Sequence, residues 1–118
     1  MIMIGNILTS KEGFQQETLD QVQERYSGFG GNLYQLMEEQ IPEVFLKLSF
    51  YQQTTYQSED SYAVYEDIDN PEKSFVIQLD PLCEVIVIWN HNIHTEIGAW
   101  SEDPELESIK FIQEEFKV

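Results

Sequence analysis

The sequence predicts an α+β fold, in which two or three N-terminal helices and a C-terminal helix pack on an antiparallel sheet of four to five strands. Apolar residues recur at helical spacing in the first third of the chain, and β-branched and aromatic runs separated by turn formers follow from about residue 54. A strong helix start signal stands near residue 103. Because 42% of the 118 residues are apolar, enough for one core, we expect a single domain over residues 1–118.

The first third is expected to contain two helices. Ser10 can cap the first helix, a glycine-rich segment at residues 27–31 ends it, and its apolar positions are Phe14, Leu19, Val22 and Tyr26. A second helix is expected to begin at Asn32. Pro42 then either ends that helix or opens another one in its first turn.

Residues 43–53 fit both a strand and a helix. The alternation expected of a strand is present at Val44, Leu46, Leu48 and Phe50. Helical spacing is also present, at Phe45, Leu48 and Tyr51. Both interpretations stay open at this point.

Short apolar runs in the second half predict an antiparallel meander. Residues 61–66 and 74–79 are expected to form a hairpin around residues 67–72, which contain the turn formers Asp, Asn and Pro. Residues 84–89 are the most apolar run, so we expect them to form the central strand, covered on both faces. A turn should then lead into a further strand at residues 93–100.

The C-terminal segment has the clearest helix signal. Asp103 is a good N-cap, Pro104 suits the first helical position, and the helix should run to about Phe116. Phe111 lies among carboxylates, so it is either tucked against a neighbouring segment or exposed for a partner. The residues expected to face the sheet are Leu106, Ile109, Ile112 and Phe116.

The sequence offers few groups suited to catalysis or metal binding. His91 and His94 with Glu96 resemble a metal site, but side chains three apart in a regular strand point to opposite faces, so no metal is predicted. The single Cys83 lies in an apolar run typical of a small buried residue and lacks basic neighbours that would activate it.

The acidic turn does not match a calcium loop either. The pattern that begins at Asp67 and Asp69 has Glu72 and Gln78 where an EF-hand needs Gly and Glu. We therefore expect a non-enzymatic protein without a cofactor.

The strongest feature is the charge. With 22 acidic against 6 basic residues and a net charge of −16, the chain should repel nucleic acids and anionic membranes and attract basic partners. No basic n-region precedes the apolar N-terminal octet and no small-residue cleavage pattern follows it, and no run approaches the roughly 18–20 apolar residues of a membrane helix. A cytoplasmic protein is expected.

Two acidic clusters are the candidate partner-binding sites, because carboxylates interleaved with aromatic side chains suit an Arg- and Lys-rich surface. The first consists of Glu59, Asp60, Glu66, Asp67, Asp69 and Glu72 with Tyr62 and Tyr65. The second consists of Glu107, Phe111 and Glu114.

The chain from about Ser74 resembles small cytoplasmic immunity proteins of bacterial contact-dependent growth inhibition and other polymorphic toxin systems. The likeness is carried by the apolar hairpin of residues 84–89 and 96–100, the segment Ser-Glu-Asp-Pro at 101–104 and the closing helix at 106–116. The resemblance implies a protein that binds a cognate toxin domain and stops its action. Together with the charge, it implies a basic toxin such as a ribonuclease, whose active site carboxylates would occlude in place of phosphates.

Two other functions stay open on the same residues. An acidic nucleic-acid mimic or adaptor that inhibits a DNA-binding partner would use the same electrostatics. A metal-dependent enzyme would instead use His91, His94 and nearby carboxylates.

Overall fold

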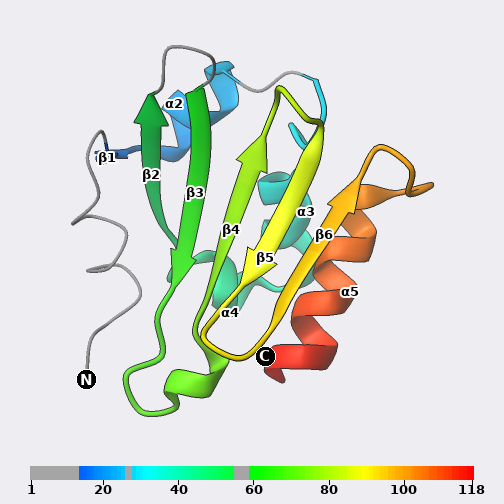
Figure 1. Cartoon of the computed structure of the whole chain (residues 1–118). Coiled ribbons are helices and arrows are strands. Elements are labelled where there is room, and N and C mark those ends of the chain that lie inside the picture. The colour runs from blue at the N-terminus through cyan, green and yellow to red at the C-terminus, as the bar shows by residue number, and fades with distance from the viewer. Residues whose placement is uncertain (1–13, 26–27, 55–58) are drawn as a thin grey trace.

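In the computed structural model, which describes residues 14–25, 28–54 and 59–118, the chain forms a six-stranded antiparallel sheet and four α-helices (Figure 1). Each strand pairs with the next one in the sequence, so the sheet order is β1-β2-β3-β4-β5-β6. The strands are β1 (Phe14–Glu17), β2 (Ser49–Thr54), β3 (Glu59–Tyr65), β4 (Phe75–Asp80), β5 (Val85–Trp89) and β6 (His94–Gly98). The helices are α2 (Leu19–Arg25), α3 (Leu33–Gln40), α4 (Pro42–Phe45) and α5 (Pro104–Phe116), with a 3₁₀ turn η1 (Pro71–Lys73).

The described helices lie together on one face of the sheet, and the main core lies between these two layers (Figure 1). Side chains alternate along each strand, so every second residue points toward the helices. The strand register aligns Phe50, Ala63, Ile77 and Ile88 in one row across four strands, and all four are buried in this core. The α+β fold class and the antiparallel meander are therefore confirmed.

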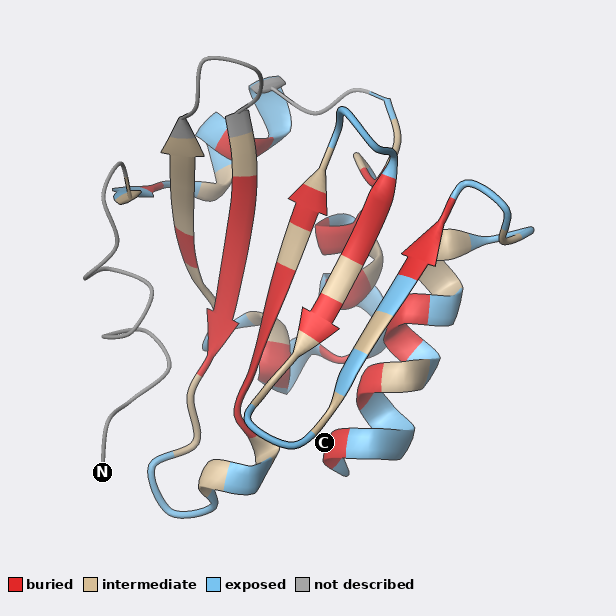
Figure 2. Cartoon of the chain, in the orientation of Figure 1, coloured by how far each residue is buried: buried red, intermediate tan, exposed pale blue. Residues whose placement is uncertain are grey.

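No described helix or strand covers the other face of the sheet, which we call the outer face (Figures 1 and 2). It is formed by the alternate strand residues, and its centre is a second, smaller apolar cluster built on Tyr62, Val64 and Val76. Half-buried aromatic residues pack around that centre, namely Phe14, Tyr51 and Trp89. The sheet thus has one face turned to helices and one aromatic face of its own.

The N-terminal helix begins later than predicted. Phe14 belongs to strand β1, which pairs with β2, and α2 begins only at Leu19. Thr18 and Gln21 form a reciprocal capping box: the Gln21 amide donates to Thr18 Oγ1 at 3.2 Å, and the Thr18 amide donates to Gln21 Oε1 at 2.8 Å. This cap starts the helix after the strand. The predicted cap Ser10 and the predicted last apolar position Tyr26 lie outside the described residues.

The ambiguous segment contains both structures in succession. The helix predicted from Asn32 is confirmed as α3, and Pro42 opens the short helix α4 at its first turn. The chain leaves this helix at Leu46, whose amide donates to the Pro42 carbonyl at 3.0 Å, and strand β2 begins at Ser49. Residues 43–53 are therefore helical in their first part and extended in their second.

The sheet has six strands where four to five were predicted, and the most apolar run is not its centre. β5 lies next to the edge strand β6, and the inner strands are β2 to β5. Its outward side chains Val87 and Trp89 are only half-buried. The expectation of a central strand covered on both faces was wrong, because neighbouring side chains on the outer face, rather than a second layer of described helices, shelter this run.

The turn between β4 and β5 also differs from the prediction. Asp80 Oδ1 accepts hydrogen bonds from the amides of Leu82 and Cys83, each at 3.1 Å, and so closes a turn at the end of β4. Glu84, expected in a strand, has a φ of 53° in this turn. Cys83 is exposed rather than buried, because the Asp80 turn takes it out of the apolar strand.

The C-terminal helix α5 is confirmed, although Leu106, one of the four residues expected to face the sheet, is only half-buried and lines a hollow beside the helix. Asp103 caps it, with Oδ1 accepting from the Leu106 amide at 3.1 Å, and Ile109, Ile112 and Phe116 are buried against the sheet. A stack of rings joins strand and helix, with Phe75 lying 4.8 Å from Phe116 between centroids. None of the described helices is long and apolar enough to cross a membrane.

Candidate protein-binding surface

An aromatic cluster occupies the middle of the outer face. The Tyr62 ring lies 4.7 Å from Phe14 and 6.2 Å from Trp89 between centroids, so rings from β1, β3 and β5 are in contact. The Tyr62 hydroxyl donates to Gln53 Oε1 at 3.1 Å, which fixes the ring on the sheet. Tyr62 itself is only 6% exposed, so the contact area of this cluster comes from the half-buried rings around it, Phe14, Tyr51 and Trp89. Rigid aromatic side chains provide such area at a small cost in conformational entropy.

Carboxylates lie on the same face as this cluster. Asp60 and Asp80 lie on the outer face at the ends of β3 and β4, and Glu96 lies on the same face of β6. Burial, followed by the negative charges of Asp60 and Asp80, raises the pKa of Tyr62 to about 12. Tyr62 is therefore a neutral hydroxyl between two acids throughout the physiological range.

Basic side chains are absent from the described strands. Strands β1 to β6 contain no lysine or arginine at any position. Of their residues on the outer face, His94 is the one with an imidazole side chain. The outer face of the described strands therefore combines aromatic rings with the half-buried Asp60 and Asp80 and the exposed Glu96, and these strands supply no Lys or Arg to pair with them.

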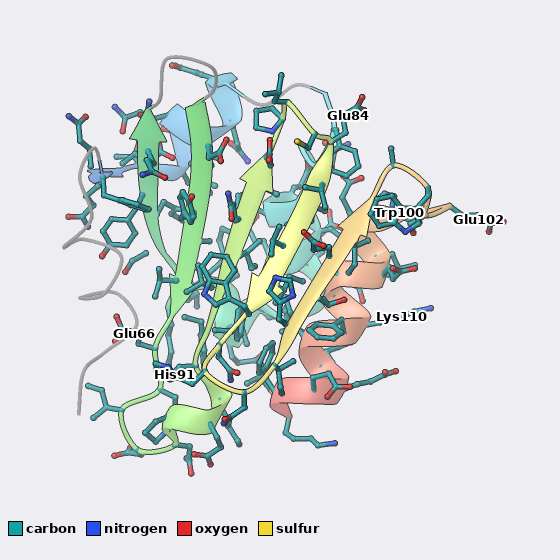
Figure 3. The ribbon with its side chains drawn as sticks, in the orientation of Figure 1. Glu66, Glu84, His91, Trp100, Glu102 and Lys110 are labelled. Carbon is teal, nitrogen blue, oxygen red and sulfur yellow. The ribbon has the colours of Figure 1, made fainter. Side chains whose placement is uncertain are left out.

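The first predicted acidic cluster does not form one surface. Asp60 and Tyr62 lie on the outer face, whereas Glu66 follows the opposite end of β3, roughly 20 Å from Asp60 at about 3.3 Å per residue. Figure 3 shows Glu66 at the same end of the sheet as His91, far from Glu84 and Trp100. The side chain of Glu59 lies outside the described residues.

Tyr65 points to the opposite side of the sheet from Tyr62. Its ring stacks on Phe75 with centroids 5.2 Å apart in the main core, and only 6% of the residue is exposed. Burial, with a smaller effect from Asp67, raises the pKa of its hydroxyl. Tyr65 therefore packs the core instead of joining Tyr62 on the outer face.

The remaining acids of the first cluster lie in the β3–β4 connection. Asp67 Oδ1 accepts from the amides of Asp69 and Asn70, each at 3.0 Å, so this carboxylate shapes the turn. Asp69 and Glu72 are exposed there. Asn90 Nδ2 donates to the Glu72 carbonyl at 3.2 Å, which ties this loop to the β5–β6 hairpin.

The second predicted cluster lies on α5, on the helix-covered side of the sheet. Glu107 and Glu114 are exposed, and Glu107 Oε1 accepts from Ser101 Oγ at 3.2 Å beside a hollow of about 490 Å³. Phe111 is half-buried and packs edge-on against Phe116 with centroids 5.9 Å apart. The two predicted clusters thus face opposite sides of the sheet.

The histidines do not assemble a metal site among the described residues. His94 and Glu96 share the outer face of β6, because they are two residues apart, while His91 lies in the β5–β6 turn. No group of three or more His, Cys, Asp or Glu residues in the described part of the chain is arranged to hold a metal ion.

No family model, curated protein or solved structure matches this chain. The chemistry of its surface is then the available guide to function. Among the described surfaces, the outer face is the one that combines aromatic contact area with several carboxylates and lacks Lys and Arg on its strands.

Four aromatic residues of this surface were missed by the sequence prediction. Phe14 was assigned to the core-facing side of a helix, although it belongs to β1. Trp89 was assigned to a doubly covered strand, although its phase differs from that of the buried Ile86 and Ile88. Tyr51 was counted only as a helical position of the ambiguous segment at residues 43–53. Trp100, just beyond β6, is 74% exposed, which no local sequence pattern indicated.

Proposed function

We propose that this chain is a non-enzymatic binding protein that neutralises a basic protein partner through its outer face. The observation that carries this proposal is the Phe14–Tyr62–Trp89 ring cluster among carboxylates on strands without Lys or Arg. Aromatic anchors surrounded by charge of one sign are suited to a protein surface of the opposite sign. The net charge of −16 adds long-range attraction that accelerates the encounter.

The resemblance to immunity proteins makes a toxin domain the proposed partner, and a ribonuclease the proposed toxin. A ribonuclease cleft holds Lys, Arg and His side chains that receive phosphates, so carboxylates can pair with the same cations and exclude RNA. Asp60 and Glu96 are the proposed contact residues on the outer face, together with the half-buried Tyr51 and Trp89. Tyr62 is only 6% exposed and supports these rings from within the cluster. We propose that inhibition takes place in the cytoplasm, where the RNA substrate is found.

The test begins with the gene immediately upstream, which the proposal expects to encode a large protein with a variable C-terminal domain. That C-terminal domain, which we call the upstream domain, is the binding partner to be tested. We expect a stable 1:1 complex by calorimetry, together with loss of RNA cleavage when the two proteins are mixed. Glu96→Lys should weaken binding at least about 10-fold, because it sets a cation against cations at the interface. Glu115→Lys is the matched control, since it makes the same change in net charge at an exposed position of α5 on the other side of the sheet.

Two outcomes would contradict the proposal. The first is failure of the upstream domain to bind. The second is an equal loss of affinity in both variants, which would mean that the total charge, rather than the outer face, governs binding. A dependence on His91 or His94 for an enzymatic activity of the chain alone would favour the metal-dependent enzyme instead.

A further inference from the structure

Trp100 is held on the surface by a glycine. Residue 98 is the last residue of β6, and its neighbour Ile97 points into the core, so the missing side chain of Gly98 would point to the outer face. A Cβ atom built at Gly98 would collide with Cε3, Cζ3 and Cη2 of Trp100. The six-membered ring of the indole therefore occupies the space that any other residue at position 98 would fill.

This packing holds the tryptophan ring in one position while most of its surface stays exposed to solvent. One side of the indole lies against the strand at Gly98, while 74% of the residue remains open to solvent. Val85 pairs with Gly98 in the register and is only 9% exposed, so it flanks the ring on the neighbouring strand. An exposed tryptophan that is already positioned loses little entropy on binding, which is typical of interface hot spots.

Three acidic residues lie in the segments that adjoin this tryptophan. Glu96 lies two residues before Gly98 on the same face, and Glu84 precedes the strand position that pairs with Gly98. Glu102 follows in the same loop, and Figure 3 shows Glu84, Trp100 and Glu102 at one end of the sheet. All three glutamates are exposed. Lys110, the basic residue of the adjacent hollow, belongs to α5 on the helix side.

We propose that Trp100 is the anchor for an arginine side chain of the basic partner. The guanidinium would stack on the solvent-facing side of the indole, and Glu96, Glu84 or Glu102 would accept its N–H hydrogen bonds. Arginine fits better than lysine, because its planar group stacks on a ring and binds carboxylates in the same arrangement. This inference rests on the proposed function, because it requires a basic partner. It adds that the group recognised on that partner is the guanidinium of an arginine.

The test compares nona-arginine and nona-lysine peptides, which carry equal charge. We expect the full chain to bind nona-arginine more tightly by calorimetry at low salt. In a Trp89→Phe background, where Trp100 is the remaining one of two tryptophans, nona-arginine should change the tryptophan emission. Trp100→Ala should weaken nona-arginine binding roughly 2- to 5-fold, the change that corresponds to a cation–π contact of about 0.5–1 kcal/mol, and should remove the preference for arginine.

Gly98→Ala tests the position of the indole separately from its presence, because the added methyl group displaces the ring while Trp100 and every charge are kept. It should lose the arginine preference as Trp100→Ala does, whereas Trp100→Phe should keep part of it. Circular dichroism of each variant checks that the fold is retained. Unchanged affinity and unchanged preference in Trp100→Ala, or no preference in the original chain, would overturn the inference.

The two proposals can fail separately. If the upstream domain binds and Glu96→Lys weakens that binding, but Trp100→Ala changes neither the domain nor the peptide affinity, the anchor is wrong and the proposed function stands. If the upstream domain does not bind while the peptides behave as expected, the arginine site stands and the toxin assignment fails.

Discussion

Tyr62 shows how the tertiary environment changes a residue that the sequence already marked as important. The sequence placed it beside acids, and the fold adds burial, contact with two aromatic rings and a hydrogen bond to Gln53. Tyr65, three positions later, has the opposite fate because three is an odd number of residues along a strand. Two tyrosines from the same acidic segment of the sequence therefore lie on opposite faces of the sheet and have different roles.

The pKa of Tyr62 leads to a prediction about alkaline stability. Its folded-state pKa of about 12 exceeds the unfolded value of 10.0, so the folded state holds this proton more tightly. The contribution to stability is complete below pH 10 and is lost as the pH rises toward 12.

Ultraviolet titration of tyrosinate should therefore lose its most alkaline step in Tyr62→Phe, and the fall in urea stability between these pH values should become shallower. Tyr51→Phe, on the same face, serves as the control. If the most alkaline step persists in Tyr62→Phe, another tyrosine ionises last and the prediction is wrong.

At the scale of elements, the sequence predicted a helix start correctly where a nearby side chain accepts a hydrogen bond from the backbone amides of the first turn. Asp103 and Pro104 predicted the start of α5 because a cap is a contact between near neighbours. The start of α2 depends on a similar local signal, the capping box of Thr18 and Gln21. The sequence prediction instead followed the apolar spacing of Phe14, Leu19 and Val22, which joins a residue of β1 to residues of α2. The strand β1 itself could not be predicted locally, because its pairing with β2 joins segments more than thirty residues apart.

The cap of α5 leads to a prediction about stability. Asp103→Ala removes the acceptor for the Leu106 amide and a negative charge at the helix start, so we expect it to lower the free energy of unfolding by about 1 kcal/mol in urea. Glu102→Ala removes the same charge one residue earlier without removing the cap, and it should cost less than half as much. Equal losses would mean that charge, rather than the hydrogen bond, accounts for the effect.

The whole molecule concentrates negative charge in a small volume, with a radius of gyration of 13.3 Å for a net charge of −16. The fold distributes the acids over both sides of the sheet, which explains why the two clusters of the sequence do not form one binding surface. Self-repulsion of this kind opposes the folded state and is weakened by salt.

Sodium chloride should therefore raise the melting temperature of this protein, because the Debye length falls from about 10 Å at 0.1 M to about 3 Å at 1 M. The control is a double variant, Glu114→Gln with Glu115→Gln, which removes two exposed charges of α5. It should melt higher than the original chain at low salt and gain less on salt addition. A melting temperature that does not depend on salt would show that self-repulsion is negligible.

The sequence by itself determined the α+β class, the meander of the second half, the capped C-terminal helix and the sign of the charge, because these depend on composition and on contacts between near neighbours. The tertiary structure decided that β5 lies next to an edge, that Cys83 is exposed, and that Trp100 rests on Gly98. These features depend on strand order and on which face of the sheet the helices cover. The pairing of strands across the sheet determines the strand order and the covered face, and this pairing is not encoded in any local pattern of residues.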